Sequence, residues 1–427
     1  MLLFKNATYY TTKGPAKGDL FVDGGKVFEG GSYSPAMCSE TIDASGLFIV
    51  PGFADVHVHL REPGFFYKES IESGTLCGAK GGYTALCAMP NLNPVPDSKE
   101  NLDVELAAIR SGAKIDVYPY GALTVGEKGK ELSDIEGLAP EVIAFSDDGK
   151  GVQNPEKMKE AMLRAKVCGK IIAAHCEDES LLDGGYVHAG RYAAAHGHKG
   201  ISSESEWKMV ERDVALAAET GVAYHVCHVS TKESVEIIRK AKAAGVNVTA
   251  ETAPHYLVLC EDDLQEDGRF KMNPPLRSRE DREALRAALA DGTLDMIATD
   301  HAPHSDEEKS RGLKGSLMGV IGLESAFAVL YTELVRKGII PFERLIYAMS
   351  TAPCRRFGIA GGDIYDGAIA NLAVLDLSKE WTVRGQDSAS KGNSTPFEGR
   401  TVCGKNIMTI YLSLIHISEP TRQEAIS

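Results

Sequence analysis

Short apolar runs alternate with amphipathic segments between about residues 51 and 360. The amphipathic segments begin at helix-start residues such as Asn154-Pro155, Ser230 and Ser278, and each ends near a glycine. Strands that alternate with helices over this length predict a parallel sheet, with a (β/α)8 TIM-type barrel as the leading arrangement. A doubly wound open sheet is the alternative, although no early strand precedes a phosphate-binding glycine motif. The runs interpreted as strands are residues 142–145, 170–175, 222–228, 246–250 and 294–300.

The two ends of the chain have a different pattern. Residues 1–50 contain short alternating segments separated by glycine turns, and residues 367–376 form an apolar run after a turn. Both patterns predict strands. We therefore expect an α/β protein in which both chain ends build a small β-sandwich. The predicted sandwich comprises residues 1–50 and 361–412, and the predicted catalytic barrel comprises residues 51–360.

Composition narrows the class of protein. Of the 427 residues, 43% are hydrophobic and 25% are charged, which is typical of a globular protein. The net charge of -14 argues against a nucleic-acid or anionic membrane partner. We find no secretory signal pattern and no apolar run long enough to span a membrane, and the nine cysteines include no Cys-x-x-Cys pair. These features predict a cytoplasmic protein with reduced thiols.

Histidines and carboxylates occur where the predicted strands end. His57 and His59 are two positions apart, so in an extended segment their side chains lie on one face. The carboxyl ends of barrel strands meet on one side of the barrel, where catalytic groups belong. Imidazoles and carboxylates gathered there would suffice for two divalent ions such as Zn²⁺. The later strand-end residues are His175, His228, Asp300 and the pair Asp147-Asp148.

Five motifs fall at or near these positions. They are His57-Val-His59-Leu-Arg61-Glu-Pro-Gly64, Met89-Pro90-Asn91, Asp147-Asp148-Gly149, Asn273-Pro-Pro-Leu-Arg277 and Asp300-His-Ala-Pro-His304. Together they resemble the amidohydrolase superfamily and, within it, the long, type I dihydroorotases of bacteria. The resemblance extends from residue 1 to about residue 400.

The resemblance implies two zinc ions in each subunit. His57 and His59 would bind the first ion, and His175 and His228 would bind the second. Asp300 would bind the first ion and would also act as the catalytic acid and base.

The resemblance also implies an aspartate between the two ions. Many relatives use a carboxylated lysine there, but this strand offers no lysine before Lys150. In the type I pattern an aspartate takes that place, and the spacing to His175 favours Asp148. Asp147 is the alternative, and its other role would be to orient the loop.

Substrate contacts are implied in the same way. Arg61, Asn91 and His304 would hold a substrate carboxylate, with the arginine as a bidentate donor. Asn273 and the backbone of Met318-Gly319 would meet the pyrimidine ring. The implied substrate-binding residues are His59, Arg61, Asn91, Asn273, His304, Met318 and Gly319.

Other histidines and cysteines have structural interpretations. His255 and His301 are expected to donate hydrogen bonds behind the site or to pack as rings. Cys176 and Cys227 adjoin ligand histidines on strands, so their side chains are expected to face the surrounding helices. The histidines interpreted as exposed or structural are His188, His196, His198, His225 and His416.

The implied reaction is that of a dihydroorotase in de novo pyrimidine (UMP) biosynthesis. A hydroxide held between the metals opens the ring of (S)-dihydroorotate, and the reverse reaction closes N-carbamoyl-L-aspartate with release of water. The resemblance leaves a homodimer and an association with aspartate transcarbamoylase open.

Two alternatives remain at this stage. A hydantoinase or allantoinase would use the carboxylated lysine and would not need the clamp formed by Arg61, Asn91 and His304. A non-catalytic subunit that scaffolds aspartate transcarbamoylase would be expected to lack metal ligands, and here all of them are present.

The sequence also leads to predictions for two further segments. Residues 305–315 are polar and bounded by glycine, which predicts a mobile loop over the site. Residues 413–427 lack the turn and strand pattern that the family would have there. We predict that they are a non-native tail of translated adapter sequence.

Overall fold

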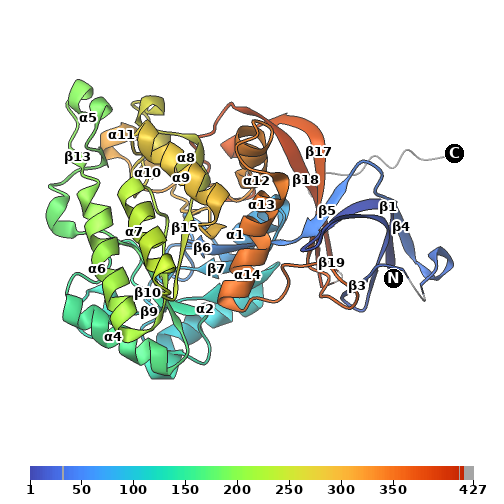
Figure 1. The fold of residues 1–427 in the computed structure, drawn as a ribbon, viewed down its shortest axis with the longest axis horizontal. Coiled ribbons are helices and arrows are strands. Elements are labelled where there is room, and N and C mark those ends of the chain that lie inside the picture. The colour runs from blue at the N-terminus through green and yellow to red at the C-terminus, as the bar shows by residue number, and fades with distance from the viewer. Residues whose placement is uncertain (31–32, 413, 418–427) are drawn as a thin grey trace.

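The computed structural model describes residues 1–30, 33–412 and 414–417. Parallel strands surrounded by helices occupy one part of the molecule, and a large sheet occupies the other (Figure 1). This mixed architecture confirms the predicted α/β class. Within those ranges, no helix combines the length and apolar character that crossing a membrane requires.

Strands from both chain ends join in one eight-stranded sheet. Its order is β19-β18-β17-β5-β1-β2-β3, and β4 pairs with β1. β17 and β5 run antiparallel with Leu372 opposite Pro51, so the blue and orange-red strands lie side by side in Figure 1. The sandwich arrangement stays a prediction. The strands are β1 (Leu2–Thr11), β2 (Gly14–Asp23), β3 (Lys26–Phe28), β4 (Glu40–Asp43), β5 (Phe48–Pro51), β17 (Leu372–Thr382), β18 (Thr401–Tyr411) and β19 (Leu414–Ile417).

The strand β19 differs from what we expected of the chain end. It pairs antiparallel with β18, with Ile415 opposite Ile410. The expectation that residues 413–427 lack a strand is therefore wrong for Leu414–Ile417, because a short segment rich in β-branched residues can extend a sheet at its edge. Residues 413 and 418–427 lie outside the described residues, and the origin of the tail stays a prediction.

Two parallel groups of strands position the site. Their orders are β6-β7-β8 and β16-β15-β14-β11-β10-β9. β8 leads through Tyr120 into β9, and the backbone oxygen of Pro119 accepts a hydrogen bond from Ile143 N at 2.9 Å. The strands are β6 (Phe53–Val58), β7 (Tyr83–Ala88), β8 (Asp116–Pro119), β9 (Gly121–Ala122), β10 (Ala144–Ser146), β11 (Ile171–Ala174), β14 (Ala223–Val226), β15 (Val248–Thr252) and β16 (Met296–Ile297), with a separate pair β12 (Val187–His188) and β13 (Gly200–Ile201).

The opposite edges of these two groups also meet. Val58 and His301 form a parallel bridge, and His59 N donates to the backbone oxygen of His301 at 2.8 Å. His301 in turn bridges Val320. The first predicted ligand motif therefore lies beside the segment that follows β16.

Helix ends follow the sequence signals closely. The Asn154 side chain caps α4 by accepting from Lys157 N, and Ser278 and Asp281 form a capping box on α9. The helices are α1 (Ile71–Gly81), α2 (Lys99–Gly112), α3 (Ile135–Leu138), α4 (Pro155–Val167), α5 (Arg191–His196), α6 (Glu204–Thr220), α7 (Lys232–Ala243), α8 (Pro254–Val258), α9 (Arg279–Asp291), α10 (Asp306–Lys309), α11 (Gly312–Gly315), α12 (Ala326–Leu330), α13 (Phe342–Ile346) and α14 (Ala352–Phe357).

The start of α7 departs from the prediction by one residue. Thr231, and not Ser230, is the N-cap, and its side chain accepts from Ser234 N. The hydroxyls of both residues donate to the buried carboxylate of Glu206.

Small side chains fill the space between the parallel strands. Ala54, Ala85, Ala144 and Ala173 come from four different strands and pack in one buried cluster. The Tyr120 hydroxyl crosses this cluster and donates to the backbone oxygen of Val56 at 2.9 Å. Larger apolar side chains pack between the strands and the helices. The resulting packed base supports the polar residues at the strand ends.

Candidate metal centre and active site

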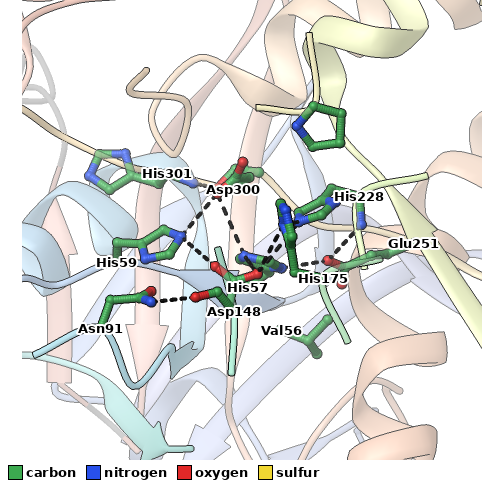
Figure 2. Close-up of polar contacts among 12 residues, drawn as sticks. Val56, His57, His59, Asn91, Asp148, His175, His228, Glu251, Asp300 and His301 are labelled. Carbon is green, nitrogen blue, oxygen red and sulfur yellow. Dashed lines mark hydrogen bonds and ion pairs between the residues drawn. The ribbon is translucent and has the colours of Figure 1, made fainter. Parts of the chain in front are cut away.

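The predicted ligand residues converge at the carboxyl ends of the parallel strands, where Figure 2 shows them pointing toward one another. His57 lies in β6, and His175 directly follows β11. His59 directly follows β6. Asp148, His228 and Asp300 come two or three residues after the ends of β10, β14 and β16. All six are buried: His57, His59, Asp148, His175, His228 and Asp300.

One group of ligands centres on the two histidines of the first motif. His59 Nε2 lies 3.1 Å from Asp300 Oδ1 and 3.4 Å from Asp148 Oδ2. His57 Nε2 lies 3.4 Å from Asp148 Oδ1 and 3.6 Å from Asp300 Oδ1. Ligand atoms about 2.1 Å from a tetrahedral metal lie roughly 3.4 Å apart, so these four side chains fit one ion.

The second group shares Asp148 with the first. His175 Nδ1 and His228 Nε2 are 2.9 Å apart. Asp148 Oδ1 lies 3.5 Å from His228 Nε2 and 3.9 Å from His175 Nδ1. Because Asp148 faces both groups, its carboxylate has the position that a ligand between two ions needs.

The ionisation of this cluster also fits a metal. Burial opposes the charge on Asp148, but His57 and its neighbours hold the pKa of this carboxyl well below its usual range. Burial likewise opposes the charge on Asp300, and the hydrogen bond from His59 keeps its pKa low. In the described part of the chain, His57 Nε2 and Asp148 Oδ1 are buried without a hydrogen-bond partner. Buried polar atoms are normally paired, and a metal between them would satisfy both.

The neighbouring Asp147 turns away from this cluster. Its Oδ1 accepts from Leu123 N at 2.8 Å and from Thr124 N at 3.0 Å, and Oδ2 accepts from the Thr124 hydroxyl. Burial raises the pKa of Asp147 to about 6. Of the two aspartates that the sequence left open, the geometry favours Asp148 as ligand and gives Asp147 the task of holding the loop.

Two buried carboxylates that the sequence analysis missed orient the histidines. Glu251 Oε1 accepts from His57 Nδ1 at 2.9 Å, and its Oε2 lies 3.0 Å from His225 Nε2. Glu177 Oε2 lies 3.3 Å from His175 Nε2 and 3.1 Å from Asn273 Nδ2. Carboxylates behind ligand histidines fix the ring orientation and the tautomer. The signals were a glutamate just after a predicted strand and another two residues after His175.

The expectation for Cys227 was wrong. Its side chain faces inward and joins His57 and Glu251 in a third group with metal-ligand spacing. The strand β14 ends at Val226, and His228 adopts a left-handed φ of 32°, so the alternation of side chains no longer holds at this point. Cys176 behaves as expected, because its thiol lies 3.4 Å from the Tyr224 hydroxyl and away from the ligands.

The histidines that we expected to support the site or to be structural include His301, His255 and His225, and these three are buried. His301 Nε2 lies 3.3 Å from Glu69 Oε2, and its Nδ1 accepts from Gly322 N at 3.2 Å. His255 packs against Tyr256 with ring centroids 4.2 Å apart, and burial lowers its pKa to about 4. His225 is also fully buried and therefore structural.

All the predicted substrate-binding residues line one cavity above the ligand cluster. Five of the predicted ligands form part of its wall, namely His59, Asp148, His175, His228 and Asp300. The residues predicted to bind substrate that lie in the wall are His59, Arg61, Asn91, Asn273, His304, Met318 and Gly319.

The rim of the cavity is basic. Arg61 Nε donates to the backbone oxygen of Pro303 at 3.2 Å, which aims its guanidinium beside His304. His304 Nε2 donates to the Met318 oxygen at 2.8 Å, and Lys68 Nζ lies 3.3 Å from His304 Nδ1. Burial and the nearby Arg61 charge lower the pKa of His304 to about 3, so the ring is neutral. Lys68 is paired with Glu308 at 3.0 Å, so the positive charge of this rim comes from Arg61. That charge suits a substrate carboxylate.

Asn91 occupies another part of the wall. Its Nδ2 donates to the backbone oxygen of Asp148 at 2.5 Å and to Glu127 Oε1 at 3.1 Å. Glu127 is a buried acid that the sequence analysis missed, and its pKa is raised to about 8 by burial and by the nearby aspartates. These contacts tie Asn91 to the loop that carries the shared metal ligand.

Comparisons with known proteins show what the chain as a whole is similar to. The family described as "Dihydro-orotase-like" matches residues 46–234. The chain is similar to the dihydroorotases of Bacillus cytotoxicus and Bacillus cereus, each 48% identical over 411 residues, with 96% of both chains covered.

Solved structures of related enzymes share the fold. The L-hydantoinase (dihydropyrimidinase) of Arthrobacter aurescens aligns with a TM-score of 0.86 and 26% identity over 97% of this chain and 95% of its own. The dihydropyrimidinase of Brevibacillus agri aligns with a TM-score of 0.85 and 26% identity over 97% of this chain and 94% of its own. These neighbours share the overall architecture, whereas the 48% identity is to dihydroorotases over nearly the full chain. The chain therefore belongs to the dihydroorotase family.

Proposed function

We propose that the protein is a dihydroorotase that interconverts N-carbamoyl-L-aspartate and (S)-dihydroorotate in de novo pyrimidine biosynthesis. One observation carries the proposal. The ligand cluster and the basic rim that Arg61 forms line a single cavity. A cyclic amide with a carboxylate substituent would meet both, because its carboxylate would face the rim while its amide carbonyl faced the cluster.

A pair of zinc ions is our proposed cofactor. His57, His59, Asp148 and Asp300 would hold the first ion, and Asp148, His175 and His228 would hold the second. The spacing of these atoms supports this assignment. When bound, such a pair lowers the pKa of a water molecule toward 7 and polarises a carbonyl group.

The chain's own residues would orient the substrate and move the proton. Arg61, Asn91 and His304 would hold the substrate carboxylate, and Asn273 with the Met318-Gly319 backbone would hold the ring. Asp300 would accept a proton from the attacking water and deliver it to the ring nitrogen as the amide bond breaks. In the direction of synthesis, the same carboxylate would take the proton from the ureido nitrogen as the ring closes.

The domain organisation that we propose follows the sequence prediction. Residues 51–360 would form a closed (β/α)8 barrel, supported by the backbone contacts of Pro119 with Ile143 and of His59 with His301. Residues 1–50 and 361–412 would form the accessory β-sandwich, and residues 413–427 would be a non-native tail.

The nine free cysteines support a reducing, cytoplasmic location. A homodimer and an association with aspartate transcarbamoylase are the partners proposed beyond the small-molecule substrate.

A hydantoinase is the second candidate, because solved hydantoinases share the fold. The absence of a lysine among residues 144–149 and the basic rim both favour a dihydroorotase.

Substrate comparison tests the proposal. The purified protein should open dihydroorotate in preference to hydantoin and allantoin, and a chelator should abolish this activity until zinc is restored. Faster turnover of hydantoin or allantoin would identify a different cyclic amidase. Absence of both metal binding and turnover of any of the three would favour the non-catalytic scaffold.

A further inference from the structure

Lys309 is a buried cation in the segment that the sequence presents as a polar loop. It is the last residue of α10, and its side chain is only 7% exposed. The neighbouring Glu307 and Ser310 are exposed. In residues 1–30, 33–412 and 414–417, no carboxylate forms a salt bridge with Lys309. An ammonium group buried without an ion pair is costly, so the contacts that retain it are informative.

The ammonium group donates to three backbone carbonyls. The distances from Lys309 Nζ are 3.0 Å to the Lys271 oxygen, 2.8 Å to the Leu317 oxygen and 2.7 Å to the Gly319 oxygen. A protonated lysine has three N–H donors, and here each of them has an acceptor. Gly319 N also donates to the Lys271 oxygen at 3.0 Å.

These carbonyls belong to both segments that form the ring-binding part of the cavity. Lys271 lies two residues before Asn273, whereas Leu317 and Gly319 flank Met318. In a trans peptide the carbonyl and the following N–H point in opposite directions, so fixing the Leu317 oxygen also fixes the direction of Met318 N–H. Gly319 has a φ of 135°, and a Cβ there would lie 2.5 Å from the Ala302 oxygen, so this backbone has little freedom to shift.

We propose that Lys309 is a positioning residue that ties the segment carrying Asn273 to the Leu317–Gly319 backbone. It thereby sets the spacing of the two cavity walls that would hold the substrate ring. This proposal rests on the proposed function in one respect, which is that the group between the two walls is taken to be the substrate ring. Lys309 does not line the cavity and acts through the backbone.

The contact between the Lys309 ammonium and the three carbonyls depends on pH because of burial and the charged groups nearby. Burial and the nearby Lys271 lower the pKa of Lys309 to about 7, against a smaller opposing effect of Asp267. Lys271 itself donates to the Lys314 oxygen at 2.7 Å. Below pH 7 all three carbonyls have a donor, and above it the neutral amine keeps only two donors.

The first test compares Lys309→Met with Lys314→Met, because Lys314 lies in the same segment with an exposed side chain. We expect Lys309→Met to raise KM for dihydroorotate at least about tenfold, to change kcat less than about threefold and to leave zinc content unchanged. Lys314→Met should match the parent protein. An unchanged KM, or a loss of zinc in parallel with activity, would overturn the proposal. Failure of the parent protein to act on dihydroorotate would instead count against the proposed function.

The second test does not depend on folding of the methionine variant. KM of the parent protein should rise as pH increases from 6 to 9 through about 7, because the third donor is lost. Lys309→Arg keeps its charge over this range, so its KM should lack that rise. A KM profile in Lys309→Arg that still rises as in the parent protein would overturn the proposal.

Discussion

The two sides of the cavity are held by different kinds of group. On the metal-facing side, buried carboxylates hold the functional rings, as Glu251 holds His57 and Glu177 holds His175. On the ring-facing side, a lysine holds backbone carbonyls in place. A carboxylate adjusts the basicity and orientation of the histidine that it contacts. A lysine that joins backbone carbonyls sets only the distance between the two cavity walls and the shape of the space between them. We therefore expect substitutions on the first side to act on metal and kcat, and those on the second side to act on KM.

Asp300→Ala should have the largest effect on catalysis. Loss of a group that moves a proton in the transition state costs about 10²–10⁴-fold in kcat, and more where metal binding also suffers. Steady-state kinetics with dihydroorotate measures this effect. A kcat within threefold of the parent protein would remove Asp300 from the role of acid and base.

Asp148→Ala and Asp147→Ala separate the metal ligand from its neighbour. Asp148 faces four histidines across both groups, so its loss should abolish binding of at least one ion and lower zinc affinity by more than the ~10–100-fold typical of an outer carboxylate. Asp147→Ala should leave the metal content largely intact. Metal analysis of the two purified variants decides between them, and the opposite ranking would move the ligand to Asp147.

Glu251→Gln should weaken zinc binding without removing a direct ligand. Loss of the carboxylate behind His57 is expected to lower metal affinity by about 10–100-fold. Competition with a chelator measures the change. Glu236→Gln on the exposed face of α7 is the matched control and should have no effect. Equal zinc affinity in both variants would show that Glu251 does not tune the ligand.

Arg61→Met tests the rim that would hold the substrate carboxylate. Loss of a charge-assisted hydrogen bond costs roughly 1.5–3 kcal/mol, or about one to two factors of ten in kcat/KM for dihydroorotate. Dihydrouracil lacks the carboxylate, so any trace activity on it should change little. A proportional loss on both substrates would mean that Arg61 supports the metal cluster or the loop.

Local sequence predicted the parts of the site that depend on strand ends. His175, Asp148 and Asp300 follow apolar runs, and the carboxyl ends of parallel strands meet whatever the detailed packing, so their convergence could be inferred. The helix caps at Asn154 and Ser278 were equally local signals. The ligand pairing and the substrate roles came from family resemblance and not from the pattern alone.

The remaining features depend on contacts between distant segments or on backbone detail. Nothing near Lys309 in the sequence indicates that its ammonium meets carbonyls from residues 271, 317 and 319. Glu251 lies at the far end of a strand whose neighbours determine what it contacts. Cys227 was misplaced because a single left-handed residue, His228, ended the strand alternation. Such a backbone angle has no reliable signature outside glycine.

The pairing of β5 with β17 also affects how the protein is made. Pro51 meets Leu372 across the sheet, so the N-terminal strands cannot complete their hydrogen bonds until the last part of the chain has left the ribosome. At about 5–20 residues per second, the wait is roughly 15–60 s. During that interval β5 exposes an unpaired edge, which makes early synthesis the stage at which chaperones matter most. The same dependence means that a ribosome stalled before β17 releases a chain in which one edge of β5 has no permanent partner.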